Sequence, residues 1–198
     1  AGCLHVTVTM PAHARPPGQP FYDASLEDAA RPAGSLVRAE PLALPPLYRA
    51  KAWRILYSTR DYAGRPLVSS GMVIISTVAQ KQAGPRKIVA WAHPTTGTQR
   101  ACAPTLAPLP HKTILGLNEL VSLGAAVVAT DYPGLGTTGP TGYLVGKGQA
   151  YALLDAVKAA QRLPNGGLGR DVVLWGYSQG GHAALFASQL AGRYAPTL

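Results

Sequence analysis

The stretch Gly176-Tyr177-Ser178-Gln179-Gly180 follows a short apolar run, VVLW at 172–175, and precedes a run of mostly small residues, GHAALFA at 181–187. A strand, a Gly-x-Ser-x-Gly turn and a helix in this order form the sequence context of a nucleophile elbow. The turn is so sharp that its two flanking positions favour glycine, which has no Cβ. The pattern therefore predicts that a serine is lifted onto a strand-to-helix turn, beside the first amides of the next helix.

Ser178 is the candidate catalytic nucleophile, because a serine in this position faces the positive end of a helix dipole and unpaired N–H groups. A serine hydroxyl is a poor nucleophile without a base, and that base needs an orienting carboxylate. In folds with this elbow the chain order is Ser, then Asp or Glu, then His. The 20 residues after Ser178 contain no Asp or Glu, and their one histidine is His182.

None of the histidines fits the role of general base. His182 lies in the first turn of the helix that Ser178 introduces, whereas a base approaches from a separate loop, so we expect a packing role for it. His93 ends the apolar stretch 87–93, and we expect it to orient the loop that follows. His5, His13 and His111 carry no local signal. We therefore predict that this chain lacks the Asp and His of a catalytic triad.

An oxyanion hole requires two N–H donors aimed at one point. The first predicted donor is the backbone amide of Gln179, directly after the nucleophile. The second is expected from the loop after the 87–93 strand, and Pro94 has no N–H to offer. The remaining candidates are Thr95, Thr96 and Gly97, and the alternative is that this loop is a plain turn.

Composition limits the range of functions. The 198 residues suit one globular domain, with 47% hydrophobic and 14% charged residues. The net charge is +9, but the Lys and Arg residues are scattered and form no run beyond the pair Arg86-Lys87, which favours a solvated basic surface over a nucleic-acid site. Contact with a lipid interface stays open. The two cysteines and the histidines show no metal-ligand spacing, and we expect neither a metal nor an organic cofactor.

The proline-rich residues 1–46 carry eight of the 18 prolines, so we expect an extended, loop-like segment that wraps over the domain. Residues 1–14 hold two alternative export signals. Ala12-His13-Ala14 has the small-x-small form of a signal-peptidase site, and Ala1-Gly2-Cys3 has the form of a lipoprotein signal end. A leader without a targeting role is the third interpretation. Both signals favour a secreted or cell-surface protein.

Residues 47–198 alternate between strand and helix patterns, which predicts the amino-terminal part of an α/β catalytic domain. An antiparallel hairpin is expected first, and then a mostly parallel sheet. The loop that begins at Asp131 should border the cleft, with Asp131 in a structural role. The expected strands are 52–57, 67–78, 87–93, 125–131 and 171–175, and the expected helices are 114–123, 147–163 and 179–190.

Several separated motifs together resemble one family. They are VAWAHPTTG at 89–97, CAP at 102–104, VVATDYPGLG at 127–136, YLVG at 143–146 and WGYSQGGH at 175–182, with FY at 21–22. This set resembles the secretory lipases related to Candida antarctica lipase A. The resemblance implies an α/β-hydrolase fold, export, and hydrolysis of carboxylic esters including triacylglycerols. It also implies that Cys102 pairs with a cysteine further along, and that the triad Asp and His and the lid lie beyond Leu198. The alternative partner for Cys102 within this chain is Cys3, if the leader is retained. Bacterial members usually read His-Gly where this chain has His93-Pro94.

Our leading hypothesis is the amino-terminal half of a secreted serine esterase or lipase, incomplete at its C-terminal side. Its substrate is an ester or lipid, the reaction passes through an acyl-enzyme on Ser178, and the partner is the C-terminal half of the same protein. Without that half we expect the chain to be inactive. Two alternatives remain: acyl transfer or peptide cleavage from the same elbow, and a non-catalytic or truncated hydrolase-like protein that binds lipid or a surface.

Overall fold

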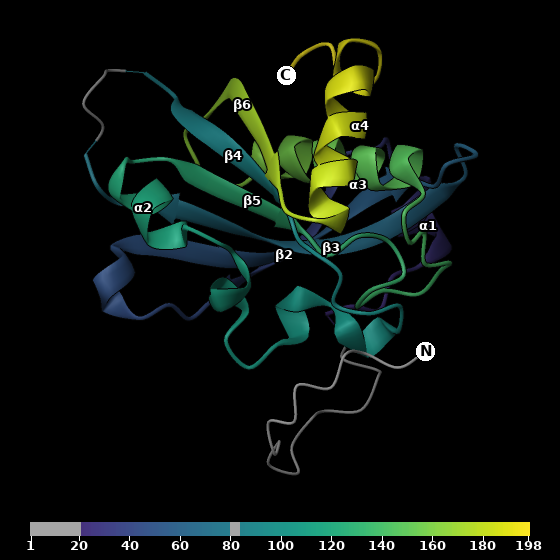
Figure 1. Cartoon of the computed structure of the whole chain (residues 1–198), viewed down its shortest axis with the longest axis horizontal. Coiled ribbons are helices and arrows are strands. Elements are labelled where there is room, and N and C mark those ends of the chain that lie inside the picture. The colour runs from purple at the N-terminus through teal and green to yellow at the C-terminus, as the bar shows by residue number, and fades with distance from the viewer. Residues whose placement is uncertain (1–20, 80–83) are drawn as a thin grey trace.

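A computed structural model describes residues 21–79 and 84–198. Among these residues, six strands form one sheet in the order β1-β2-β3-β5-β4-β6 (Figure 1). The strands are β1 (Leu36–Leu42), β2 (Ala50–Arg60), β3 (Pro66–Ser76), β4 (Arg86–Ala92), β5 (Ala126–Thr130) and β6 (Leu168–Gly176). The α/β class predicted from the sequence is confirmed, as is the antiparallel hairpin, which is formed by β2 and β3.

The sheet is mixed, so the prediction of a mostly parallel sheet is wrong. The pairs β1–β2, β2–β3 and β3–β5 are antiparallel, and only β5–β4 and β4–β6 are parallel. β5 lies between β3 and β4, antiparallel to β3 and parallel to β4, so it joins the antiparallel part of the sheet to the parallel part.

The expectation of a loop-like amino-terminal segment is wrong for residues 21–46. They form helix α1 (Leu26–Ala30) and strand β1. A capping box between Ser25 and Asp28 caps the N-terminus of α1. Pro41 lies within β1 although proline has no backbone N–H. It is tolerated because β1 is an edge strand, so the missing N–H interrupts no hydrogen bonds between strands. The export signals of residues 1–14, and Cys3 with them, lie outside the described residues.

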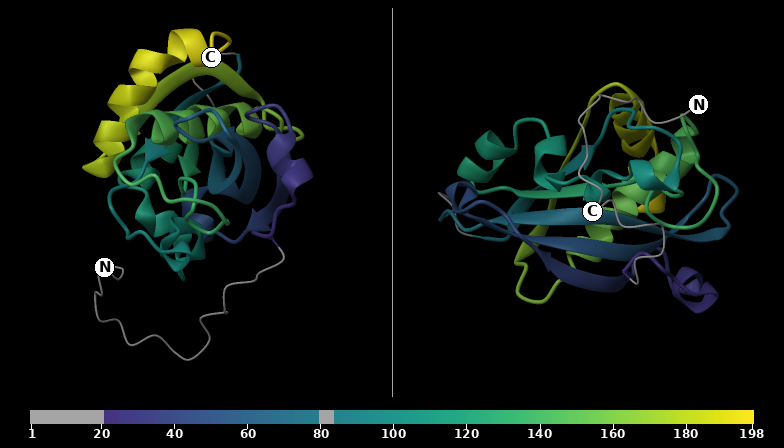
Figure 2. Two further views of the ribbon diagram at one scale, coloured as in Figure 1. Left: turned by 90° about the vertical axis from the view of Figure 1, so that its right-hand side faces the viewer. Right: turned by 90° about the horizontal axis from the view of Figure 1, so that it is seen from below.

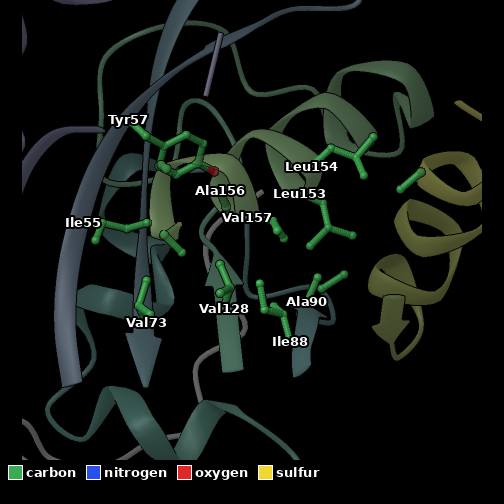
Figure 3. Close-up of a cluster of buried hydrophobic side chains, with 14 of the residues drawn as sticks. Ile55, Tyr57, Val73, Ile88, Ala90, Val128, Leu153, Leu154, Ala156 and Val157 are labelled. Carbon is green, nitrogen blue, oxygen red and sulfur yellow. The ribbon is translucent and has the colours of Figure 1, made fainter. Parts of the chain in front are cut away.

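Helices lie on both faces of the sheet (Figures 1 and 2), and an apolar cluster fills the space on each face. On one face, helices α3 (Gly146–Ala160) and α4 (Gln179–Tyr194) pack on alternate strand residues such as Ile55, Val73 and Val128 (Figure 3). On the other face, helix α2 (Leu117–Ser122) packs on Ile74, Trp91 and their neighbours. This alternation fixes which face of the sheet each strand residue occupies.

Two predicted helices are shorter than expected. α2 begins at Leu117 rather than 114, because Gly116 has a left-handed backbone (φ 66°) that separates it from the 3-10 helix Pro110–Thr113. α3 ends at Ala160, and Leu163 packs from the following turn. No helix in the described ranges has both the length and the apolar character that crossing a membrane requires.

Strand β6 forms one edge of the sheet and pairs only with β4 among the described strands. Val173 and Trp175 on this strand are exposed. An exposed strand edge with apolar side chains is a surface that favours pairing with further polypeptide.

Candidate active site

The elbow has the predicted geometry. β6 ends at Gly176 and α4 begins at Gln179, and the exposed Ser178 lies between them with φ 55° and ψ −118°. A Cβ on Gly176 would overlap the backbone of Gly180, and a Cβ on Gly180 would overlap the carbonyl oxygen of Ala92 in β4. Glycine is therefore required at both positions, and the strained serine backbone is held by its surroundings.

The structure brings two of the predicted oxyanion groups to one cavity. Gln179 and Gly97 both line it, and the N–H of Gln179, as the first residue of α4, has no partner within its own helix. Thr95 and Thr96 belong to the same loop as Gly97 but are not among the residues lining the cavity. The Thr95 hydroxyl instead lies 3.2 Å from the Tyr143 hydroxyl. Among the three loop candidates, the geometry favours Gly97.

His93 connects the loop after β4 to the loop after β5. Its ring is buried, with Nδ1 2.6 Å from the Pro94 carbonyl oxygen and Nε2 3.2 Å from that of Asp131. The Tyr132 hydroxyl donates to the His93 carbonyl at 3.2 Å. Burial lowers the pKa of the His93 imidazole, so the neutral ring is favoured. These contacts fit a positioning role for His93 toward the loop that holds Gly97.

Replacing His93 by alanine should therefore destabilise the fold by about 2–3 kcal/mol, through the hydrogen bond lost from the one N–H of the neutral ring and through a new cavity. The matched control is His182→Ala, because His182 is only partly buried and its one polar contact is long, 3.4 Å from Nδ1 to the Gln149 Oε1. We expect it to change the free energy of unfolding by less than about 1 kcal/mol. Urea denaturation measures both, and equal losses in the two variants would contradict the positioning role.

Asp131 has the surroundings of a structural residue. Its buried carboxylate accepts hydrogen bonds from the Ser70 hydroxyl at 2.6 Å, the Thr105 backbone N–H at 3.0 Å and the Thr105 hydroxyl. Burial raises the pKa of this carboxyl, while the hydrogen bonds from Ser70 and Thr105 oppose the rise. Asp131 thus joins β3 and the 3-10 helix Pro104–Leu106 to the end of β5, and its bonding capacity is used there.

The side chain of Ser178 forms no hydrogen bond with any histidine in residues 21–79 and 84–198. The His182 ring contacts Gln149 and Phe186 instead. The same ranges hold no group of three His, Cys, Asp or Glu residues arranged to bind a metal ion. The described residues thus supply a serine and candidate oxyanion donors, but no base for that serine.

The sequence predicted that the loop beginning at Asp131 borders a cleft, and Tyr132, Pro133 and Leu135 of this loop line the cavity beside the elbow, whereas the other walls were not predicted. The walls of the cavity come from the β2–β3 turn, the loop after β5 and the start of α3. The YLVG motif at 143–146 is the sequence pattern that could have indicated the wall at the start of α3, because Tyr143 and Val145 are two of the lining residues. Gln149, buried one turn further along α3, also lines the cavity and carried no sequence signal.

A mixed sheet with helices on both faces and a serine on a strand-to-helix elbow defines an α/β-hydrolase fold. Solved structures agree. Candida antarctica lipase A in its closed state matches with a TM-score of 0.77 and 23% identity, over 93% of this chain and 45% of that protein. The rice cell wall degrading esterase LipA from Xanthomonas oryzae, in a ligand-bound form, matches with a TM-score of 0.66 and 26% identity, over 82% of this chain and 48% of that protein.

Sequence comparisons point to a particular family. The secretory lipase family model matches residues 111–198. Lipase 6 of Candida albicans is 29% identical over 98% of this chain and 44% of its own length, and lipase A of Moesziomyces aphidis is 26% identical over 92% and 41%. The resemblance to the secretory lipases is confirmed. The chain spans less than half the length of these relatives.

Proposed function

We propose that this chain carries the nucleophile and the oxyanion site of a secreted carboxylic ester hydrolase, a triacylglycerol lipase. Ser178 Oγ attacks the ester carbonyl, the alcohol leaves, and water hydrolyses the acyl-enzyme. The N–H of Gln179 and an N–H from the Thr95–Gly97 loop stabilise the oxyanion. The observation that carries the proposal is the exposed Ser178 at positive φ, between two glycines that have no room for a Cβ.

The general base and its carboxylate, in this proposal, come from further polypeptide. The support is twofold: no described histidine bonds to Ser178, and the relatives are about twice as long as this chain. We infer that the C-terminal half packs against β6, where one strand edge is unpaired among the described strands and Val173 and Trp175 are exposed.

A lipid interface is the proposed place of action. Tyr177, next to the nucleophile, is 61% exposed and Leu185 on α4 is 71% exposed, so apolar surface lies beside the elbow. The net charge of +9 favours approach to anionic surfaces. The proposed export is consistent with the secretory family model.

The test compares hydrolysis of p-nitrophenyl butyrate by residues 1–198 with hydrolysis by an extended protein, in which the downstream coding sequence follows Leu198. A positioned general base contributes roughly 10²–10⁴-fold in rate, so the extended protein should be faster by at least about 10²-fold. Equal rates from the two proteins would contradict the proposal that the base lies in polypeptide beyond Leu198.

A non-catalytic lipid-binding protein is the second candidate, favoured by the absence of a hydrogen-bonded base at Ser178 among the described residues and by the exposed Tyr177 and Leu185. It predicts binding to phospholipid vesicles by the extended protein without ester hydrolysis. Co-sedimentation with vesicles, run beside the p-nitrophenyl butyrate assay, separates the two functions.

A further inference from the structure

We propose that the cavity beside the elbow binds a short acyl chain, of about the length of butyryl, and so selects short-chain esters. The inference rests on the proposed ester hydrolysis and adds the class of acyl group. The cavity lies at the right place because Gly97 and Gln179 form part of its wall. An ester whose carbonyl oxygen meets these two backbones has the start of its acyl chain at the cavity.

The lining suits a hydrocarbon. Its walls carry the side chains of Leu67, Tyr132, Pro133, Leu135, Pro140 and Val145. Tyr132 and Leu135 are almost fully buried, so these walls are packed from behind.

The carboxylate at the cavity, that of Asp61, has its hydrogen-bond partners outside it. The Asp61 carboxylate accepts the backbone N–H groups of Ala63 and Arg65 at 2.9 and 2.8 Å, and also the Arg65 guanidinium. The Gln149 carbonyl oxygen lies 3.4 Å from the His182 Nδ1. No unpaired carboxylate of the described residues therefore faces the cavity, and an uncharged alkyl chain meets no electrostatic penalty there.

The size of the cavity sets the length of the chain. Its volume is about 90 Å³, whereas an apolar cavity of about 150 Å³ holds benzene with its six carbons. In proportion, roughly four carbons fit. One wall is the β2–β3 turn at Asp61 and Tyr62, which lies beside the start of α3 at Gly148.

The test uses the Ser178→Ala protein, so that binding is read without chemistry. Acetate, butyrate, hexanoate and octanoate, the acyl products of increasing length, are titrated while the amide NMR signals of Gly97, Gly142 and Gln179 are followed. We expect affinity to rise about fourfold per methylene group up to butyrate and not beyond. Affinity that keeps rising through octanoate, or shifts that spare these amides, would overturn the proposal.

Two lining variants move the length limit in opposite directions. Leu67→Ala enlarges the cavity and should raise hexanoate affinity at least about fourfold, while Val145→Phe fills it and should remove the preference for butyrate over acetate. The matched control is Leu185→Ala, the same truncation on the exposed face of α4 and outside the cavity. Urea midpoints confirm that each variant is folded. If the affinities for the four carboxylates were the same in the parent protein and in all three variants, the pocket assignment would be overturned.

Failure of the pocket and failure of the proposed hydrolase give different results. Labelling of wild-type Ser178 by a fluorophosphonate, together with no length limit in the titrations, overturns the pocket alone. A length limit near butyrate without labelling of Ser178 in the extended protein supports the pocket and contradicts ester hydrolysis.

Discussion

Replacing Ser178 by alanine should lower kcat/KM for p-nitrophenyl butyrate by at least about 10³-fold in the extended protein, because no acyl-enzyme can form. The residual rate would come from the oxyanion donors and substrate binding alone. The matched control is Ser188→Ala, a second exposed serine on α4, which should leave the rate within about twofold of wild type. Retention of more than a tenth of the rate in Ser178→Ala would contradict the role of nucleophile.

This loss should be chemical rather than structural. Ser178 is exposed, and no neighbour packs over it as over a core residue. We expect the positive φ at Ser178 to persist with alanine, because it is held by the close approach of β6, α4 and the end of β4, which the flanking glycines permit. We therefore expect the free energy of unfolding of Ser178→Ala to stay within about 1 kcal/mol of wild type, as measured by urea denaturation.

Gly180→Ala should give the second largest effect, since the new Cβ would overlap the Ala92 carbonyl oxygen and lie 2.9 Å from that of His93. Both obstacles are backbone atoms at the end of β4, so α4 itself must move. We expect a destabilisation of about 2–3 kcal/mol. We also expect at least about 10²-fold slower hydrolysis, because displacement of the helix start by about 1 Å misaligns the Gln179 N–H.

Gly192→Ala is the control for Gly180→Ala. Gly192 belongs to the same helix, and a Cβ there meets nothing within 4 Å. This variant should be neutral or up to about 1 kcal/mol more stable, because alanine favours the helix over glycine. Wild-type stability and rate in Gly180→Ala would show that α4 does not depend on close contact with β4.

The elbow and the β2–β3 hairpin were predictable because their signals are local. Gly-x-Ser-x-Gly between a strand and a helix, and two alternating runs around a turn, each lie within about 30 residues. The mixed sheet was not predictable in this way. Its decisive pair joins Val73 of β3 to Val128 of β5, two residues whose patterns are equally compatible with parallel neighbours. Proline content likewise concealed β1, since Pro41 is tolerated only because β1 lies at an edge.

From the sequence, the loop that holds the candidate oxyanion donors could be predicted, but not which backbone N–H of that loop faces the cavity. Chain order and strand ends indicated structural roles for His93 and Asp131, and their buried hydrogen bonds agree with those roles. The choice among Thr95, Thr96 and Gly97 needed the three-dimensional arrangement, since only Gly97 lines the cavity with Gln179. The cavity itself combines residues from Asp61 to Gln179, and no local pattern encodes that combination.

The central claim is that Ser178 is an accessible nucleophile held beside converging N–H groups. Reaction of the extended protein with a fluorophosphonate probe, followed by peptide mass spectrometry, tests it most directly. We predict a single modified residue, Ser178, and no modification after Ser178→Ala. Absence of any adduct, or an adduct on a different serine, would contradict the account.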